Sequence, residues 1–293
     1  MHYDIRLHLH YDYARAAAGG RHQVRVVPLT IPGVQRVIAS SLAFTPKPSE
    51  RSDFTDFFGN GVTAIAFRDV HKTLDIRMSA RVAVSRAEPG FDVSPDIARL
   101  KAELPAVWSL APDSPHHFLA ASDHAGIEAA ITAYARISLS AAPSAIGVAN
   151  DFCNRIYEDF AYDGEATTVH TKAGDAFKLK RGVCQDFSHI MIAGLRGLGI
   201  PAGYVSGFLR TIPPPGKERL EGADAMHAWV KVWCGREAGW QEFDPTNGMH
   251  ASNDHITVGY GRDYSDVAPI VGVLKITGGQ AGEQSVDVIP VAA

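Results

Sequence analysis

One segment of the chain, residues 181–201, constrains the fold more than any other. Its apolar side chains recur three or four positions apart, which is the spacing of one helix face, at Phe187, Met191, Leu195 and Leu198. Gly199 and Pro201 follow at once and are typical of the end of a helix. The pattern therefore predicts a largely buried helix with Cys184 in its first turn.

A β-hairpin is predicted farther along the chain. Residues 227–234 alternate strictly, as a strand does, and residues 240–244 follow as a second strand after a turn at 235–239. Pro245 ends the second strand because it cannot donate to a sheet. His227 begins the first strand and Asp244 ends the second, so both lie at the same open end of the ribbon.

The first 95 residues predict β structure. Alternating or apolar stretches separated by turn residues span 2–13, 22–29, 36–44 and 73–84. Residues 56–67 add an Asn60-Gly61 pair between two apolar runs, which is the strongest local signal for a hairpin. Several strands at short intervals indicate an antiparallel sandwich or barrel.

Helical spacing then appears at residues 95–104, 125–138 and 143–160. We therefore expect an α+β protein in three parts. An antiparallel, sandwich-like β domain would span residues 1–95, a helical link 96–145, and a core 146–293 in which the cysteine helix packs on an antiparallel sheet. A chain of 293 residues has room for about two domains.

Charge and cysteine content narrow the class of protein. The 28 Lys+Arg and 32 Asp+Glu residues leave no basic excess for nucleic acid. No segment resembles a secretory signal or a run of about 18 apolar residues that could cross a membrane. Three cysteines, an odd number, argue against a disulfide framework. We expect a cytoplasmic protein without membrane or nucleic-acid partners and, lacking a phosphate-binding glycine motif, without a cofactor.

Cys184, His227 and Asp244 together indicate nucleophilic catalysis. A thiol at a helix N-terminus meets unpaired amides and the positive end of the helix dipole, and both favour the thiolate. An imidazole can carry the proton, and a carboxylate can hold that ring in one tautomer. The backbone amide of Cys184 is a candidate oxyanion donor. The spacing is compatible with a Cys-His-Asp triad.

Five motifs along residues 145–275 resemble the bacterial transglutaminase-like family. In chain order they are Gly182-Val183-Cys184-Gln185-Asp186, Gly199-Ile200-Pro201-Ala202, His227-Ala228-Trp229, Phe243-Asp244-Pro245-Thr246-Asn247-Gly248 and Gly261-Arg262-Asp263-Tyr264. The first 95 residues are similar to the β-rich domain that often precedes this family's core.

The resemblance implies a papain-like core that forms a thioester from an amide or peptide. By position, Cys184 would be the nucleophile, His227 the base and Asp244 the orienting carboxylate. Members pass the acyl group to water or to an amine, and the triad is common to both reactions. The resemblance also implies peptide or protein substrates and partners in proteolysis or peptide-ligation systems.

Gln185, Trp229, Asp263 and Tyr264 are candidate substrate-binding residues. Trp229 shares a strand face with His227 and could wall the acyl site. Gln185 either assists the oxyanion or points away, while Asp263 and Tyr264 either line the cleft or brace the hairpin. The loop 211–225 is either a lid or a solvated connection.

The other polar groups favour plain structural interpretations. Asp186 and His189, three residues apart, are expected on a helix surface or in a local hydrogen bond. Loop solvation explains His250, Asp254 and His255 better than a metal does, and we expect no metal site. Cys153 and Cys234 are expected to be packing residues.

The sequence thus predicts a cysteine-dependent acyl-transfer enzyme. Hydrolysis of a peptide or amide bond is the first expectation because water is always present. Transfer to an amine, as in a transglutaminase, is the alternative within this chemistry. An inactive core that serves as a protein-interaction module is the alternative outside it.

Overall fold

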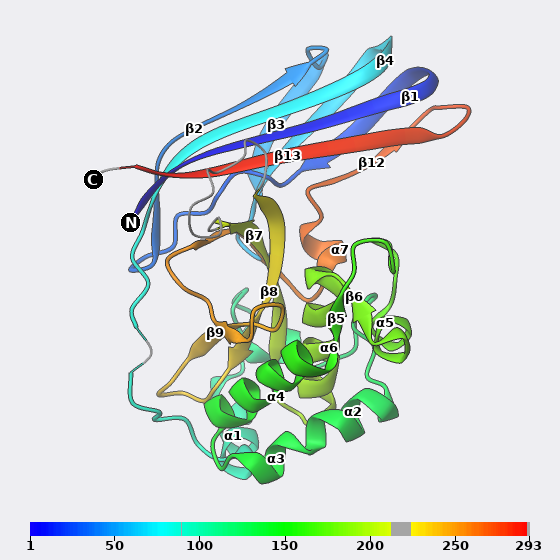
Figure 1. Ribbon diagram of the computed structural model, residues 1–293. Coiled ribbons are helices and arrows are strands. Elements are labelled where there is room, and N and C mark those ends of the chain that lie inside the picture. The colour runs from blue at the N-terminus through cyan, green and yellow to red at the C-terminus, as the bar shows by residue number, and fades with distance from the viewer. Residues whose placement is uncertain (89, 212–223, 292–293) are drawn as a thin grey trace, which may run out of the picture.

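Two antiparallel sheets organise the computed structural model of this protein, which describes residues 1–88, 90–211 and 224–291. A six-stranded sheet lies across one end of the molecule, and the helices gather around a five-stranded sheet at the other end (Figure 1). The described residues thus form the mixed α+β fold that was predicted, with a β domain preceding a helix-rich core.

The six-stranded sheet takes its strands from both ends of the chain: β1 (His2–Val24), β2 (Gln35–Thr45), β3 (Glu50–Thr55), β4 (Gly61–Val84), β12 (Ile270–Leu274) and β13 (Gln280–Val291). Strands β1 and β4 are long and pair side by side. β12 and β13 share the other edge of β1, and β2 and β3 share the other edge of β4.

Alternation along these strands gives the sheet one buried face. Every second residue at the start of β1 is buried, namely Tyr3, Ile5, Leu7 and Leu9. This face packs against three apolar residues of the second sheet, Phe208, Ile256 and Val258. The N-terminal β domain is therefore a single layer, and the core of the protein covers it in place of a second sheet of its own.

The five-stranded sheet has the order β10-β9-β8-β7-β11 and is antiparallel throughout. Its strands are β7 (Ala202–Leu209), β8 (Ala225–Trp233), β9 (Trp240–Asp244), β10 (Met249–His250) and β11 (His255–Gly261). β8 and β9 form the predicted hairpin, in which Trp233 pairs with Trp240. A short parallel pair, β5 (Ala161–Tyr162) and β6 (Arg181–Gly182), lies apart from it.

The helical elements surround this second sheet. They are α1 (Ile97–Glu103), η1 (Leu104–Val107), η2 (Pro115–Phe118), α2 (Ala129–Arg136), α3 (Ser138–Ala141), α4 (Ala145–Asp159), α5 (Ala173–Leu179), α6 (Cys184–Gly197) and α7 (Tyr264–Val267). Among the residues described, no helix combines the length and the apolar character needed to cross a membrane.

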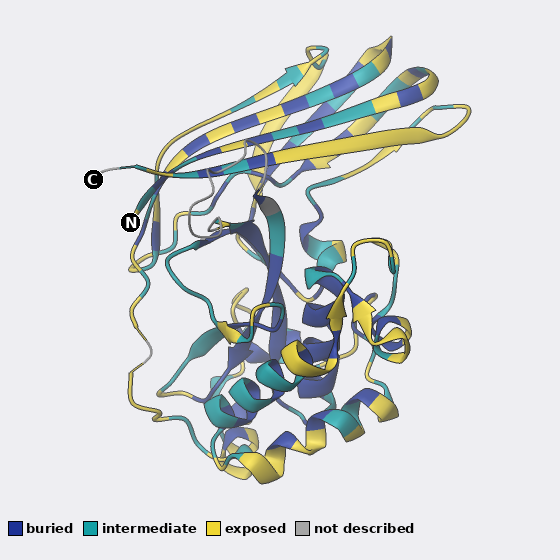
Figure 2. Ribbon diagram, viewed as in Figure 1, coloured by how far each residue is buried: buried dark blue, intermediate teal, exposed yellow. Residues whose placement is uncertain are grey.

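Helix α6 is the predicted cysteine helix and lies at the centre of the core. Residues 185–196 are all buried, and Figure 2 shows α6 and β8 mostly in the colour of buried residues. Its neighbours approach closely: a Cβ on Gly194 would lie 2.6 Å from the ring of Phe152 in α4. A Cβ on Gly197 would lie 2.1 Å from the hydroxyl of Thr132 in α2.

Two expected domain boundaries differ from the structure. The core predicted over residues 146–293 ends earlier, because β12 and β13 leave it and pair with β1. The helical link predicted over 96–145 is part of the core, since Leu100, Ile131 and Ala135 are buried in the same apolar cluster as α6. The first difference arises because β1 is a long central strand and needs partners on both edges. The second arises because the amphipathic helices of the link need a surface for their apolar faces.

Asn60 ties the two sheets together at the β3–β4 turn. Gly59, with φ of +86°, is the turn residue whose backbone favours glycine. Asn60 is fully buried; its Nδ2 donates to the carbonyl of Tyr260 at 2.8 Å, and its Oδ1 accepts from the Tyr260 amide at 2.7 Å. The Asn60 side chain therefore forms hydrogen bonds with both the amide and the carbonyl of Tyr260, a residue of β11.

We expect Asn60→Ala to lower the free energy of unfolding by about 3 kcal/mol, because two buried backbone groups lose their partner. Urea unfolding followed by circular dichroism measures this. The exposed Ser41→Ala on β2 is the control and should change stability by no more than about 0.5 kcal/mol. Equal stability of the two variants would contradict this role of Asn60.

Candidate active site

Cys184 is the first residue of α6 and is partly exposed. Val183 precedes it in extended conformation and has no capping hydrogen bond from its side chain. The Asp186 carboxylate accepts instead from the Val183 amide at 2.9 Å and from the Thr167 hydroxyl at 2.6 Å. A Cβ on Gly182 would lie 2.5 Å from that carboxylate, so glycine is what permits this approach.

The β8–β9 hairpin brings His227 and Asp244 together. Nε2 of His227 lies 2.8 Å from Oδ2 of Asp244, and both side chains are almost completely buried. The Cys184 sulfur is near enough to help raise the pKa of the His227 ring. Since Nε2 faces Asp244, Nδ1 is the ring nitrogen left for the sulfur. The structure thus joins Cys184, His227 and Asp244 in one chain of interactions.

The electrostatics of this chain favour a charged ring. Burial alone would lower the pKa of His227, but the hydrogen-bonded Asp244 carboxylate and the nearby Cys184 sulfur raise it to about 10. Burial would likewise raise the pKa of Asp244. The charge on His227 and the hydrogen bonds from His227 and His255 hold that pKa well below its usual range.

Asp244 has further partners that sequence reasoning missed. His255 Nε2 lies 3.1 Å from the same oxygen as His227, and the Asn247 side chain donates to it at 2.6 Å. The amide of Ser252 donates to Nδ1 of His255, so Nε2 carries the hydrogen that faces Asp244. The expectation that His255 is a solvated loop residue was wrong, because His255 is fully buried at the start of β11.

The alternation of residues 255–258 is a signal that could have placed His255 on a strand. The ring nitrogens of His227 and His255 and the Asp244 carboxylate lie within 4.8 Å of one another. This set of donors resembles a metal-binding set in composition, and its atoms are engaged in the hydrogen bonds described above.

Three of the four candidate substrate-binding residues have structural partners. Gln185 donates to the carbonyl of Val169 at 3.0 Å and so holds that segment against the start of α6. Trp229 is fully buried, stacks beside the His227 ring and donates to Glu242 at 2.7 Å.

Asp263 is buried at the start of α7. Its carboxylate accepts from the amides of His124 at 2.7 Å and Ser265 at 2.9 Å, neither of which belongs to the β8–β9 hairpin. His189 is also buried, and burial lowers the pKa of its ring to about 3. Its Nε2 accepts from the amide of Tyr264, so α6 and α7 are linked. Asp186 and His189, which were expected on a helix surface or in a local hydrogen bond, are therefore interior, and the bond from the Val183 amide to Asp186 is such a local bond.

Tyr264 lines a cavity of about 660 Å³ between the six-stranded sheet and the core. Tyr11 and Tyr13 of β1 line the same cavity, together with Val169 and His170. Because Gln185 holds Val169, this cavity borders a segment attached to the first turn of α6. Most of the loop proposed as a lid, residues 212–223, lies outside the described residues.

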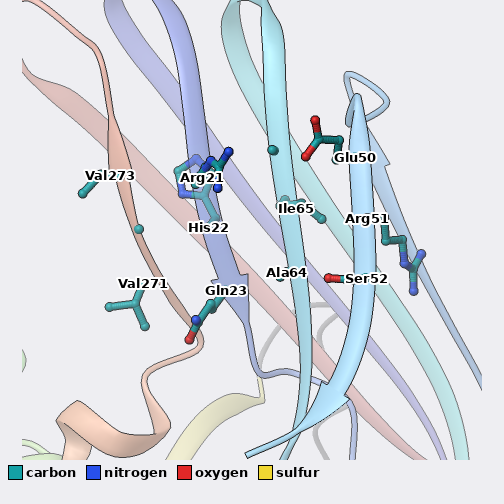
Figure 3. A pocket seen from close by; sticks show the side chains of 12 residues that line it. Arg21, His22, Gln23, Glu50, Arg51, Ser52, Ala64, Ile65, Val271 and Val273 are labelled. Carbon is teal, nitrogen blue, oxygen red and sulfur yellow. The ribbon is translucent and has the colours of Figure 1, made fainter.

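A second cavity, of about 740 Å³, adjoins the first on the six-stranded sheet and shares His22, Val271 and Gly272 with it (Figure 3). It is lined by residues of β1, β3, β4 and β12, with Arg21, His22, Glu50 and Arg51 among its polar side chains. None of the candidate site residues lines it. Of the candidate site residues, Tyr264 lines the first cavity, while Cys184, His227 and Asp244 line neither of the two.

We expect the His227 ring to be cationic at pH 8, where an ordinary histidine is neutral, because its pKa is raised to about 10. The nitrogen and carbon chemical shifts of the ring, measured by NMR from pH 5 to pH 11, report this directly. Cys184→Ala should lower the midpoint without abolishing the shift, since Asp244 remains. A neutral ring at pH 8 would contradict the ion pair between His227 and Asp244.

The raised pKa of His227 also makes the free energy of unfolding depend on pH. The unfolded ring has a pKa of about 6.5, so protonation of the folded ring stabilises the protein fully below that pH. The contribution is lost as the pH rises through about 10. The advantage of wild type over His227→Gln in urea unfolding should therefore shrink between pH 6.5 and pH 10.

Comparisons with known proteins identify the family of this chain. Residues 3–83 match the bacterial transglutaminase-like N-terminal region, and residues 132–245 match the transglutaminase-like superfamily. An uncharacterized protein of Mycobacterium tuberculosis is 38% identical over 263 residues, covering 87% of this chain and 82% of the relative. One of Mycobacterium leprae is 30% identical over 270 residues, covering 90% of each.

A solved structure, described as "a Putative Cysteine Protease from Cytophaga hutchinsonii", superposes with a TM-score of 0.77. The two are 21% identical, and the match covers 100% of this chain and 91% of that one, so it shows a shared fold. The fold, the two family matches and the relatives lead to one assignment. The chain belongs to the transglutaminase-like superfamily and carries the bacterial transglutaminase-like N-terminal region.

Proposed function

We propose that this protein is a cysteine-dependent acyl-transfer enzyme that hydrolyses a peptide or amide bond. The observation that carries the proposal is the contact of His227 with both Asp244 and Cys184 at the start of α6. A binding module has no need of a buried imidazole placed between a carboxylate and a thiol. The family assignment supports the same chemistry.

The reaction runs through a thioester. The Cys184 sulfur attacks the carbonyl carbon of the substrate amide, and the proton held on His227 goes to the leaving nitrogen as the C–N bond breaks. Water then attacks the thioester while His227 takes one of its protons. The sulfur leaves as the C–S bond breaks, and the proton taken from water remains on His227, which restores the starting state. The products are a carboxylic acid and an amine, and Asp244 stabilises the ring while it is charged.

The start of α6 supplies a donor for the oxyanion. The amides of a first helical turn have no intrahelical partner, and the Val183 amide is already used by Asp186. The amide of Cys184 is our proposed donor to the developing negative charge. Because the Asp186 carboxylate accepts a hydrogen bond from the Val183 amide, it fixes the backbone that positions the Cys184 amide.

A peptide or protein is the proposed substrate, approaching through the cavity beside Tyr264. That cavity is walled by tyrosines and by the segment that Gln185 holds, and its size suits a few residues of extended chain. The neighbour described as "a Putative Cysteine Protease from Cytophaga hutchinsonii" is in line with this substrate class. The cytoplasm is the proposed compartment, in line with three free cysteines, and proteolysis or peptide-ligation systems are the proposed setting.

Cys184→Ala should reduce turnover by more than about a thousandfold, because the nucleophile is lost, without loss of thermal stability. Cys153→Ala is the matched control: that cysteine is fully buried in α4, so we expect activity to be retained. The measurement is cleavage of a proteome-derived peptide library, read by mass spectrometry. Equal cleavage by wild type and Cys184→Ala would contradict the proposal.

The interaction-module alternative has its own signature. Under it, no peptide is cleaved by wild type, and iodoacetamide modifies Cys184 at pH 6 no faster than it modifies glutathione. If Cys184 is a thiolate at pH 6, iodoacetamide modifies it faster than it modifies glutathione, and His227→Ala removes this difference.

Water is the expected acceptor for the acyl group. Peptides that wild type cleaves should give free acids even when a primary amine such as cadaverine is added in large excess. The masses of the products separate the two outcomes, since the amine adduct is heavier than the acid. Predominant formation of the adduct would make the protein a transglutaminase in activity.

A further inference from the structure

A second group of polar side chains lies on the six-stranded sheet, on the face turned away from the core. Leu7 and Leu9 of β1 point into the core, so the residues between and after them, His8 and His10, point to the opposite face. Asp75 of β4 pairs with His10 in the neighbouring strand and shares this face. Two imidazoles and one carboxylate therefore meet across two strands.

These three side chains converge on one point. Oδ1 of Asp75 lies 2.7 Å from Nε2 of His8 and 3.1 Å from Nδ1 of His10. All three ligand atoms lie within 4.8 Å of one another. Around a tetrahedral zinc ion with bonds of about 2.0–2.2 Å, donor atoms are about 3.4 Å apart. Small side-chain movements would open the cluster to that spacing.

The remaining nitrogen of His10 has a partner of the kind that orients metal ligands. Nε2 of His10 lies 3.3 Å from Oδ2 of Asp12, two residues along the same strand. A metal-bound histidine commonly gives its other N–H to a carboxylate, which fixes the tautomer and the ring orientation. Glu283 of β13 pairs with His10 from the other side, so its side chain lies on the same face of the sheet.

From this arrangement we propose a binding site for a divalent transition metal of the zinc class, with His8, His10 and Asp75 as ligands and Asp12 as the positioning residue. Two imidazole nitrogens with one carboxylate suit Zn²⁺, whereas Ca²⁺ and Mg²⁺ prefer oxygen donors alone. Bound there, the metal would cross-link β1 and β4, the two long strands of the sheet.

One neighbouring cation competes for the same carboxylate. The guanidinium of Arg77 lies 3.3 Å from Oδ1 of Asp75. Its side chain is 57% exposed, so it can turn into solvent when a metal binds. The cluster shares no residue with the Cys184 site, so the two proposals stand or fall separately.

The test is Zn²⁺ binding by isothermal titration calorimetry to tag-free full-length protein, freed of metal by chelator. Cys184→Ala serves as the common background, which removes the exposed thiol as a zinc ligand. We expect one Zn²⁺ per chain, and loss of that event in the His8→Ala/His10→Ala variant. The matched control His116→Ala/His117→Ala removes two histidines from η2 and should bind as the background does.

Two further measurements distinguish a metal site with oriented ligands from surface histidines that bind metal without a fixed geometry. Asp12→Asn should weaken Zn²⁺ binding about tenfold while keeping the stoichiometry, as loss of an orienting carboxylate does. Co²⁺ should give the visible absorption of a four-coordinate ion in the background and not in the His8→Ala/His10→Ala variant. Circular dichroism checks that each variant is folded.

Equal Zn²⁺ binding by the His8→Ala/His10→Ala variant and its control would overturn the proposal. So would the absence of a one-to-one event in the background protein.

Discussion

The buried carboxylate of Asp244 is the constraint on which the rest of this site depends. A charged group without solvent must have compensating partners, because its isolated burial is far more costly than any single contact is favourable. Asp244 has them from three parts of the chain: His227 in β8, His255 in β11 and Asn247 in the following turn. Meeting that demand fixes the ends of the strands relative to one another.

The orientation of His227 follows from this demand. With its Nε2 on Asp244, the ring can offer only its other edge to the sulfur of Cys184. Trp229 stacks beside the ring, and its own indole N–H is anchored on Glu242. The imidazole is therefore held by charge on one side and by packing on another before any substrate arrives.

The helix end of the site is built on the same logic. Asp186 satisfies the Val183 amide, Gln185 holds the carbonyl of Val169, and His189 accepts from the amide of Tyr264. Each is a buried polar side chain on α6 whose partner is a backbone group outside the helix. A helix that seems purely apolar in its spacing thus also organises the walls around its first turn.

Local patterns in the sequence predict much of this fold. Apolar spacing with a glycine stop places α6, and strict alternation with a turn and a proline places β8 and β9, hence His227 beside Asp244. Pairing between distant segments is different: alternation shows that a strand exists, and not which edge it joins. For that reason the attachment of β12 and β13 to β1 and the contact of His255 with Asp244 could not be predicted.

The pairing of β13 with β1 has a consequence for the order in which the sheet can form. The twelve residues of β13 cover one edge of β1, and the whole helix-rich core lies between these two strands in the chain. Until β13 has been synthesised, β1 has an open edge that other chains could pair with. The six-stranded sheet is therefore complete only after the core has been made, and nascent chains that stop before β13 should be the species most exposed to aggregation.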